Sequence, residues 1–240
     1  MSEDLQLPPF LRPFVLPYQP VEPLHVGDLD LYLPQATPAP AVLMIHGGPI
    51  RPDMPARPRQ WSAYRGYASL LAQTGLVGAM FEHGFVDDQT LGVARDDIRR
   101  ALAALRDDSR VDADRVGLWF FSAGGLLMGS FLDPPPPGVV AVAGTYAAPA
   151  DPDLDGTDLR QAIDTAPNST VPLMVVRPQH DFDWIAPATD ELLERCRATG
   201  RAVDVIDVPG GHHGFETVDD TDDSRDAVRR SIAWWADALP

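Results

Sequence analysis

The stretch Trp119–Gly125 reads Trp-Phe-Phe-Ser-Ala-Gly-Gly, and it decides the fold. The apolar run Val116–Phe121 predicts a buried strand, and the apolar residues up to about Leu132 predict a helix directly after it. A strand that turns abruptly into a helix would hold Ser122 at the carboxyl edge of a sheet, beside a helix N-terminus that stabilises negative charge. The two glycines that end the stretch suit so tight a turn.

The same alternation of strand and helix extends outward from this stretch. Apolar runs predict strands at Leu24–Leu33 (at the edge of a sheet), Ala41–His46, Val77–Phe81, Val139–Thr145, Leu173–Val176 and Val203–Val208. Apolar residues at helical spacing predict helices at Gln60–Thr74, Ala94–Arg106, Glu191–Arg197 and Arg225–Leu239, and a helix is also indicated near Asp158–Ala166. Buried strands that alternate with helices indicate one α/β domain, with a mostly parallel central sheet covered by helices on both faces.

The first 23 residues differ from the rest of the chain, because they contain six prolines among apolar residues. Proline lacks a backbone donor, so this segment is not expected to form a helix or a central strand. We expect a Pro-rich N-terminal arm over 1–23 that lies on the body or on a partner subunit, followed by a single domain over 24–240. A disordered tail is the alternative. The apolar arm makes a homodimer conceivable.

The charge balance excludes several classes of protein. The 240 residues carry 19 basic and 35 acidic side chains, a net charge of −16, and all the basic ones are arginine. Without lysine there is no Schiff-base or P-loop lysine, and a field of negative sign argues against nucleic acid or an anionic membrane as partner. The single cysteine excludes a disulfide framework. Since no signal peptide or membrane span is visible, we expect a soluble cytoplasmic protein.

A glycine turn follows the strand predicted at Ala41–His46, in the sequence His-Gly-Gly-Pro at 46–49. Such glycines let the backbone approach a substrate and present amides to a developing oxyanion. We expect the amide of Gly48 to be one donor and that of Ala123, which follows the serine, to be the other. A plain glycine turn is the alternative.

Two further loops carry a candidate acid and a candidate base. Asp181 and Asp183 follow the strand predicted at Leu173–Val176, and Asp181 is preferred because it lies nearer the strand end. Trp184 adjoins this loop and is expected to line the substrate pocket; an indole that caps the edge of the core is the alternative. The adjacent His212 and His213 follow the next strand, and their spacing does not choose between them.

Serine, aspartate and histidine occur in the order of the α/β-hydrolases, each at the carboxyl end of a predicted strand. Over roughly 24–240 the chain resembles that superfamily, and most closely its dienelactone-hydrolase-like and prolyl-oligopeptidase-like branch. The segments that carry the resemblance are HGGP at 46–49, FFSAGG at 120–125, HDFDW at 180–184 and HHGFE at 212–216. It implies that His213 is the base. Two departures are the serine in place of the cysteine of dienelactone hydrolases, and Phe120 where the pattern G-x-S-x-G has glycine.

These features together predict a serine hydrolase that cleaves small carboxylic esters through Ser122, His213 and Asp181, without cofactor or metal. The chain is too short for a large cap domain, so small-molecule esters are favoured over long lipids. The alternatives are a peptidase acting on small peptides, a zinc hydrolase, and a hydrolase fold that has lost activity and binds a partner. Taken alone, Ser122 is also compatible with an ordinary helix cap.

Overall fold

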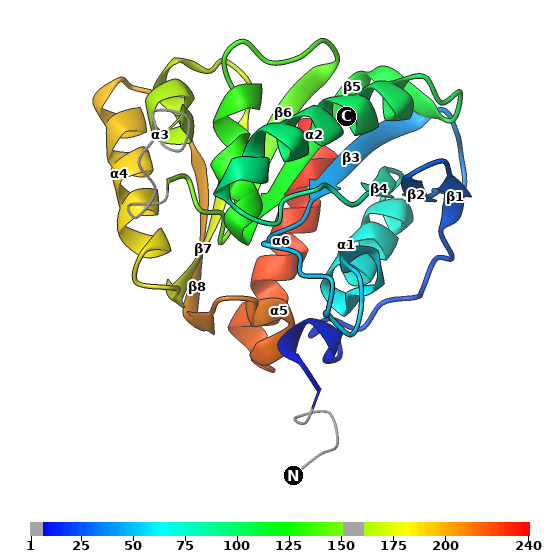
Figure 1. The fold of residues 1–240 in the computed structure, drawn as a ribbon, viewed down its shortest axis with the longest axis horizontal. Coiled ribbons are helices and arrows are strands. Elements are labelled where there is room, and N and C mark those ends of the chain that lie inside the picture. Colours follow the sequence, from blue (N-terminus) through cyan, green and yellow to red (C-terminus); the bar gives the residue numbers. More distant parts are fainter. Residues whose placement is uncertain (1–6, 151–160) are drawn as a thin grey trace.

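The computed structural model describes residues 7–150 and 161–240, and an eight-stranded sheet forms its centre (Figure 1). The strands lie in the order β1-β2-β4-β3-β5-β6-β7-β8. Strands β3 to β8 pair in parallel, whereas β1 and β2 are antiparallel to their neighbours. Their bounds are β1 Leu24–Val26, β2 Leu29–Tyr32, β3 Ala39–Ile45, β4 Val77–Met80, β5 Val111–Phe121, β6 Val139–Thr145, β7 Leu173–His180 and β8 Asp204–His212.

Helices cover both faces of the sheet. One apolar core lies under α1 (Ser62–Gln73) and α6 (Asp222–Ala238), and a second lies under α2 (Leu91–Arg106) and α4 (Ile185–Ala198). The remaining helical segments are α3 Gln161–Thr165, α5 Phe215–Val218 and the 3₁₀ helices η2 Pro9–Leu11, η3 Pro58–Gln60, η4 Asp88–Thr90, η5 Ser122–Phe131 and η7 Ala166–Asn168.

The central strands β3, β4 and β6 are almost entirely apolar because both of their faces are buried. In β5, Leu118 and Phe120 belong to the core beneath α2, whereas Trp119 and Phe121 belong to the core beneath α6. This alternation follows the two-residue period of a strand. The prediction of a mostly parallel sheet covered on both faces is confirmed.

Several predicted elements differ in detail from the structure. The edge strand expected at Leu24–Leu33 is a hairpin of β1 and β2, because Gly27 adopts a φ of +57° between them. The segment after Ser122 is a 3₁₀ helix rather than an α-helix, and its glycines weaken the preference for an α-helix. Near Asp158–Ala166, the structure has α3 and the start of η7, and the positions before 161 lie outside the described residues.

The described part of the N-terminal arm lies against the body of the protein. The ring of Phe10 stacks on that of Trp61, with 4.7 Å between their centroids. Farther along, the Val15 amide donates to the carbonyl oxygen of Glu216 over 2.7 Å. In Figure 1 the arm therefore runs beside α5, at the end of the molecule where the strands of the parallel sheet have their carboxyl ends.

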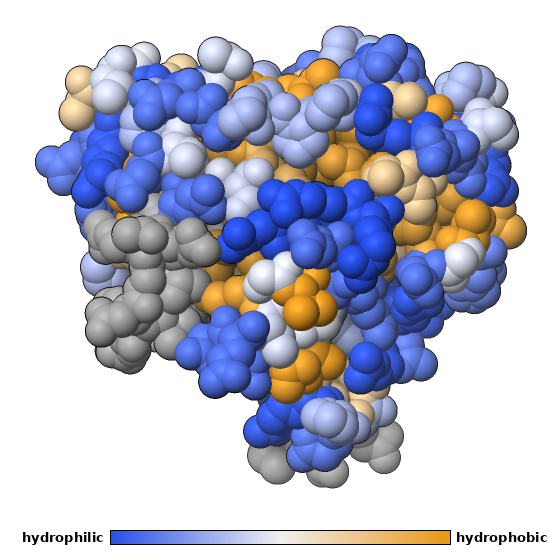
Figure 2. Space-filling view, turned by 45° about the horizontal axis from the view of Figure 1, so that its top comes forward, coloured by the Kyte–Doolittle hydropathy of each residue, from blue (hydrophilic) through white to orange (hydrophobic). Residues whose placement is uncertain are grey.

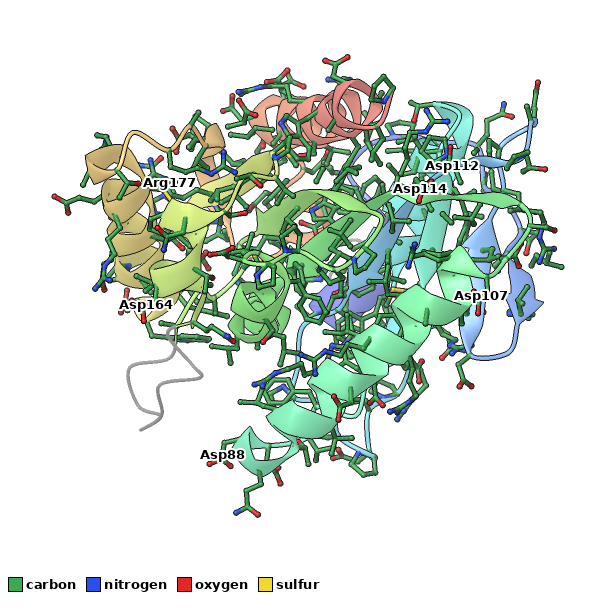
Figure 3. All side chains as sticks on the ribbon, turned by 90° about the horizontal axis from the view of Figure 1, so that it is seen from above. Asp88, Asp107, Asp112, Asp114, Asp164 and Arg177 are labelled. Atoms are coloured by element: carbon green, nitrogen blue, oxygen red, sulfur yellow. The ribbon has the colours of Figure 1, made fainter. Side chains whose placement is uncertain are left out.

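The acidic side chains labelled in Figure 3 lie at the periphery of the molecule. Figure 3 shows Asp88 and Asp107 near the two ends of α2, with Asp112 and Asp114 close to the second end. Hydrophilic residues cover most of the face drawn in Figure 2, and apolar patches lie between them. Within 7–150 and 161–240, no helix is long and apolar enough to span a bilayer.

Candidate active site

Ser122 lies at the junction of β5 and η5, in the left-handed region of backbone conformation. Its φ is +51°, which is uncommon for a residue with a side chain and costs free energy. Such a turn places a serine hydroxyl at the exposed carboxyl edge of a sheet. The local structure is thus the strand–serine–helix junction that the sequence predicts.

Close backbone packing explains the glycines that surround this serine. A Cβ atom on Gly124 would lie 2.5 Å from the carbonyl oxygen of His46, and one on Gly47 would lie 2.7 Å from the Cβ of Ser122. Phe120 replaces the first glycine of the usual pattern without disturbing the turn, because its side chain is fully buried and packs against the ring of Phe131. Its departure from the pattern therefore leaves the turn at Ser122 intact.

A chain of two hydrogen bonds connects Ser122, His213 and Asp181. The serine Oγ lies 2.8 Å from His213 Nε2, and His213 Nδ1 lies 2.7 Å from Asp181 Oδ1. Because a carboxylate can only accept, Nδ1 carries the proton, and Nε2 is left free to accept the serine proton. Asp181 directly follows β7 and His213 directly follows β8, so the sheet edge itself brings the three side chains together.

The structure also separates the two adjacent histidines, between which the spacing did not choose, and the two aspartates, of which Asp181 was preferred. His212 turns toward Asp219, whose carboxylate accepts from its backbone amide and lies 2.9 Å from its Nδ1. Asp183 is exposed, whereas the side chain of Asp181 is 3% exposed. The stacked ring of Phe182, 4.3 Å from that of His213, covers the imidazole. His213 and Asp181 are thus the pair placed beside the serine.

The turn after β3 carries the amide of Gly48, one of the two donors that the sequence predicts near Ser122. The Gly47 amide donates to the hydroxyl of Tyr64, whereas the Gly48 amide donates to no acceptor in the described part of the chain. Ala123 is the second residue of η5, where backbone amides have no acceptor within the helix. Gly48 lines the cavity together with Ser122, and Ala123 directly follows the serine, so these two amides remain the candidate donors.

Two stacked histidines, His46 and His83, support the Gly47–Gly48 turn, which directly follows His46. This contact was not predicted from the sequence. His46 and His83 are buried, with 3.6 Å between ring centroids. The His83 amide donates to His46 Nε2, and His83 Nε2 donates to the His46 carbonyl. Burial lowers the pKa of His83 to about 4 and that of His46 well below its ordinary value, so both rings are neutral at pH 7.

A cavity of about 290 Å³ opens in front of Ser122. Its walls come from the arm, from the turn after β3, from α1 and from the loops after β6 and β8. Trp184 is not among the described residues that line this cavity; it packs against the core beneath α4. The indole therefore caps the edge of the core, and the expectation that Trp184 lines the substrate pocket is not met.

Tyr146 and Glu216 line the cavity, and sequence analysis assigned neither of them a role in an ester hydrolase. The Tyr146 hydroxyl donates to Oε1 of Glu216, and its ring lies 4.5 Å from that of His213. Glu216 is 1% exposed, and burial raises the pKa of its carboxyl to about 7. The sequence could have pointed to Glu216, because this residue ends the segment HHGFE at 212–216, which also contains His213.

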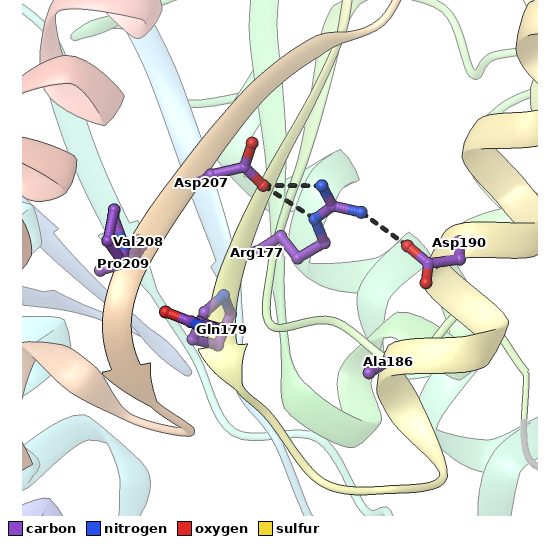
Figure 4. A pocket seen from close by; sticks show the side chains of 8 residues that line it. Arg177, Gln179, Ala186, Asp190, Asp207, Val208 and Pro209 are labelled. Atoms are coloured by element: carbon purple, nitrogen blue, oxygen red, sulfur yellow. Dashed lines mark hydrogen bonds and ion pairs between the residues drawn. The ribbon is translucent and has the colours of Figure 1, made fainter.

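A second cavity, of about 340 Å³, lies away from Ser122 between β7, β8 and α4. Figure 4 shows Arg177 at its centre, bridging Asp207 and Asp190. None of its described lining residues is a candidate nucleophile. Elsewhere in the described ranges, no group of three or more histidine, cysteine, aspartate and glutamate residues is placed to hold a metal ion.

Solved structures share the arrangement of strands and helices with this chain. Carboxyl esterase 2 of the fungus Tuber melanosporum has a TM-score of 0.66 at 18% identity, over 88% of this chain and 83% of that one. Thermogutta terrifontis esterase 2, phosphoramylated by tabun, has a TM-score of 0.68 at 15% identity, over 91% and 93%. Acylaminoacyl peptidase of Pyrococcus horikoshii has a TM-score of 0.74 at 16% identity, over 92% of this chain and 42% of the peptidase.

These likenesses identify the α/β-hydrolase fold that the sequence predicts. This chain spans less than half the length of the peptidase. A comparison with curated proteins gave no match. The model of the dienelactone hydrolase family matches residues 30–238, so the chain belongs to the dienelactone hydrolase family.

Proposed function

We propose that this protein is a serine hydrolase that cleaves small carboxylic esters through an acyl-enzyme intermediate. The observation that carries the proposal is the pair of hydrogen bonds, 2.8 and 2.7 Å long, from Ser122 through His213 to Asp181. A serine beside a neutral imidazole, itself held by a carboxylate, is the arrangement that activates a hydroxyl for attack on a carbonyl.

In the first step Ser122 Oγ attacks the ester carbonyl carbon, and its proton passes to His213 Nε2. The carbonyl oxygen becomes an oxyanion, which the amides of Gly48 and Ala123 stabilise. Collapse of this intermediate breaks the bond to the alcohol oxygen, and the alcohol leaves with the proton from His213. Water then repeats the sequence on the acyl-enzyme, releases the acid and restores the free serine.

Asp181 orients the imidazole and stabilises its charged form during each proton transfer. Its Oδ1 also accepts from the Phe182 amide over 2.8 Å, which holds the carboxylate in place. The ring of Phe182 covers His213, so less water reaches the imidazole.

Hydrolysis of 4-nitrophenyl esters of increasing acyl length tests the proposal. We expect turnover of the acetate and butyrate esters, with a decline for long chains because the cavity is about 290 Å³. Ser122→Ala should reduce kcat by at least about 10³-fold. Equal activity of the wild type and Ser122→Ala would contradict the proposal.

Cleavage of small peptides is the second candidate, supported by the likeness to the acylaminoacyl peptidase. Esters and anilides of one acyl group separate the two activities. An esterase should cleave the 4-nitrophenyl ester far faster than the matching 4-nitroanilide, whereas a peptidase should accept both.

A further inference from the structure

Aromatic rings form much of the wall of the cavity in front of Ser122. Phe10, Trp61 and Tyr64 line it as a continuous stack, with ring centroids 4.7 Å apart in the first pair and 5.7 Å in the second. Tyr146 adds a fourth ring, next to His213. Apolar groups pack against such rings, and a cation is attracted to a ring face that is open to the cavity, since the face carries partial negative charge.

The charges of the cavity favour a cation over an anion. Its described lining residues include one carboxylate, Glu216, and no arginine. The chain has no lysine that could supply a positive charge instead. A substrate with a carboxylate would therefore meet no opposite charge in the described wall, whereas a substrate with an ammonium group would meet Glu216.

Glu216 is incompletely hydrogen-bonded where it stands. Oε1 accepts from the Tyr146 hydroxyl, but Oε2 is buried without a partner in the described part of the chain. The groups that face this carboxyl are Tyr64 and Tyr67 on α1, Tyr146 after β6 and Asp219 after α5; each of them is neutral or negative at pH 7. A cation in the cavity would supply the missing positive partner.

The molecule as a whole strengthens this preference. Its net charge of −16 attracts cations toward the surface and repels anions. Glu216 lines the cavity and is 1% exposed, so salt screens its charge only weakly there.

We propose that the cavity binds an ester whose alcohol or acyl part carries an ammonium group, held by the aromatic rings and by the charge of Glu216. This inference rests on the proposed function, since it names the substrate class of the same site. Neutral esters of the same shape should bind less tightly, and esters that carry a carboxylate should bind least.

Choline and its neutral isostere 3,3-dimethylbutan-1-ol test the preference without depending on which side of the ester carries the charge. Each is measured as a competitive inhibitor of 4-nitrophenyl acetate hydrolysis at pH 8. The wild type should bind choline at least about tenfold more tightly than the alcohol. Glu216→Gln should lower that preference to about threefold or less, because the rings remain while the charge is lost.

Glu194→Gln is the matched control, since it makes the same change at an exposed position on α4. Its preference should equal that of the wild type. Equal binding of the two ligands by the wild type, or an unchanged preference in Glu216→Gln, would overturn the inference. If Glu216→Gln fails to fold, the wild-type comparison alone still decides, because it needs no variant.

Calorimetry of both ligands on Ser122→Ala separates this inference from the proposed function. If the wild type shows no esterase turnover but Ser122→Ala prefers choline, the proposed function is overturned and the cation site stands. If the wild type hydrolyses esters but Ser122→Ala binds both ligands equally, the proposed function stands and the cation site is overturned.

Discussion

Ser122 and Tyr146 both have a left-handed backbone, at the ends of the neighbouring strands β5 and β6. Their φ values are +51° and +37°, and such conformations cost about 1–3 kcal/mol each. The two residues also line the same cavity. Because two strained backbone conformations occur at the same edge of the sheet, we infer that the surrounding fold holds these two side chains in fixed positions.

The two aspartates after β7 provide a matched pair of variants. Asp181→Asn should lower kcat about 10³- to 10⁴-fold, because an amide can hold His213 in the wrong tautomer. Asp183→Asn should remain within about threefold of the wild type, since its side chain is exposed and away from the imidazole. Steady-state kinetics with 4-nitrophenyl acetate measure both, and similar losses in the two variants would contradict the assignment of Asp181.

Glu216, which lines the cavity, also makes the free energy of unfolding depend on pH. Burial raises the pKa of its carboxyl to about 7 from 4.5. The folded chain therefore retains a proton that the unfolded chain releases between pH 4.5 and 7, and this contribution to stability is lost as the pH rises through that range. The loss amounts to about 3 kcal/mol at 1.36 kcal/mol per pKa unit.

Glu216→Gln stays neutral at every pH and escapes this loss. We expect the variant to be more stable than the wild type at pH 8 and close to it at pH 4.5. Urea denaturation at the two pH values measures the difference. A variant that is less stable than the wild type at pH 8 would show that Glu216 carries no such cost.

At the scale of the elements, α6 packs directly on β5. A Cβ on Gly117 would lie 2.1 Å from the Trp235 ring, which is fully buried between helix and strand. Gly117→Ala should destabilise the fold by about 1–3 kcal/mol through overpacking. Gly92→Ala, in the first turn of α2 with nothing within 4 Å of the added Cβ, should be neutral or mildly stabilising. Urea midpoints compare the two, and an unaffected Gly117→Ala would contradict this packing.

Strands β3 to β8 could be predicted because each contains a run of apolar residues with a helical segment after it. The hairpin at Gly27 was missed because the apolar alternation continues through the turn that separates β1 from β2. The 3₁₀ geometry of η5 was missed because its apolar residues suit either helix. Periodicity reports burial, and it does not distinguish these backbone geometries.

Ser122, Asp181 and His213 could be found because each directly follows a strand, and neighbouring parallel strands end at one edge. Tyr146 and Glu216 could not be linked from the sequence, since 70 positions separate them and their contact depends on how α5 lies against the end of β6. For Trp184 the loop could be predicted from the sequence but the direction of the side chain could not, and the indole packs against the core.

At the scale of the whole molecule, the charge of −16 should affect the rate at which charged substrates arrive. We expect kcat/KM for acetylthiocholine to fall several-fold between about 10 mM and 0.5 M salt, because salt screens the attraction. The neutral isostere S-(3,3-dimethylbutyl) thioacetate should show little change. Parallel salt dependence of the two thioesters would rule out electrostatic steering.

The central claim is that Ser122 is a nucleophile activated by His213. Labelling by a fluorophosphonate probe, with the modified residue mapped by mass spectrometry, tests it most directly. We expect rapid labelling of the folded wild type at Ser122, none at that position in Ser122→Ala, and labelling slowed by at least about 10²-fold in His213→Gln. Folded wild-type protein that takes up no label at Ser122 would contradict it.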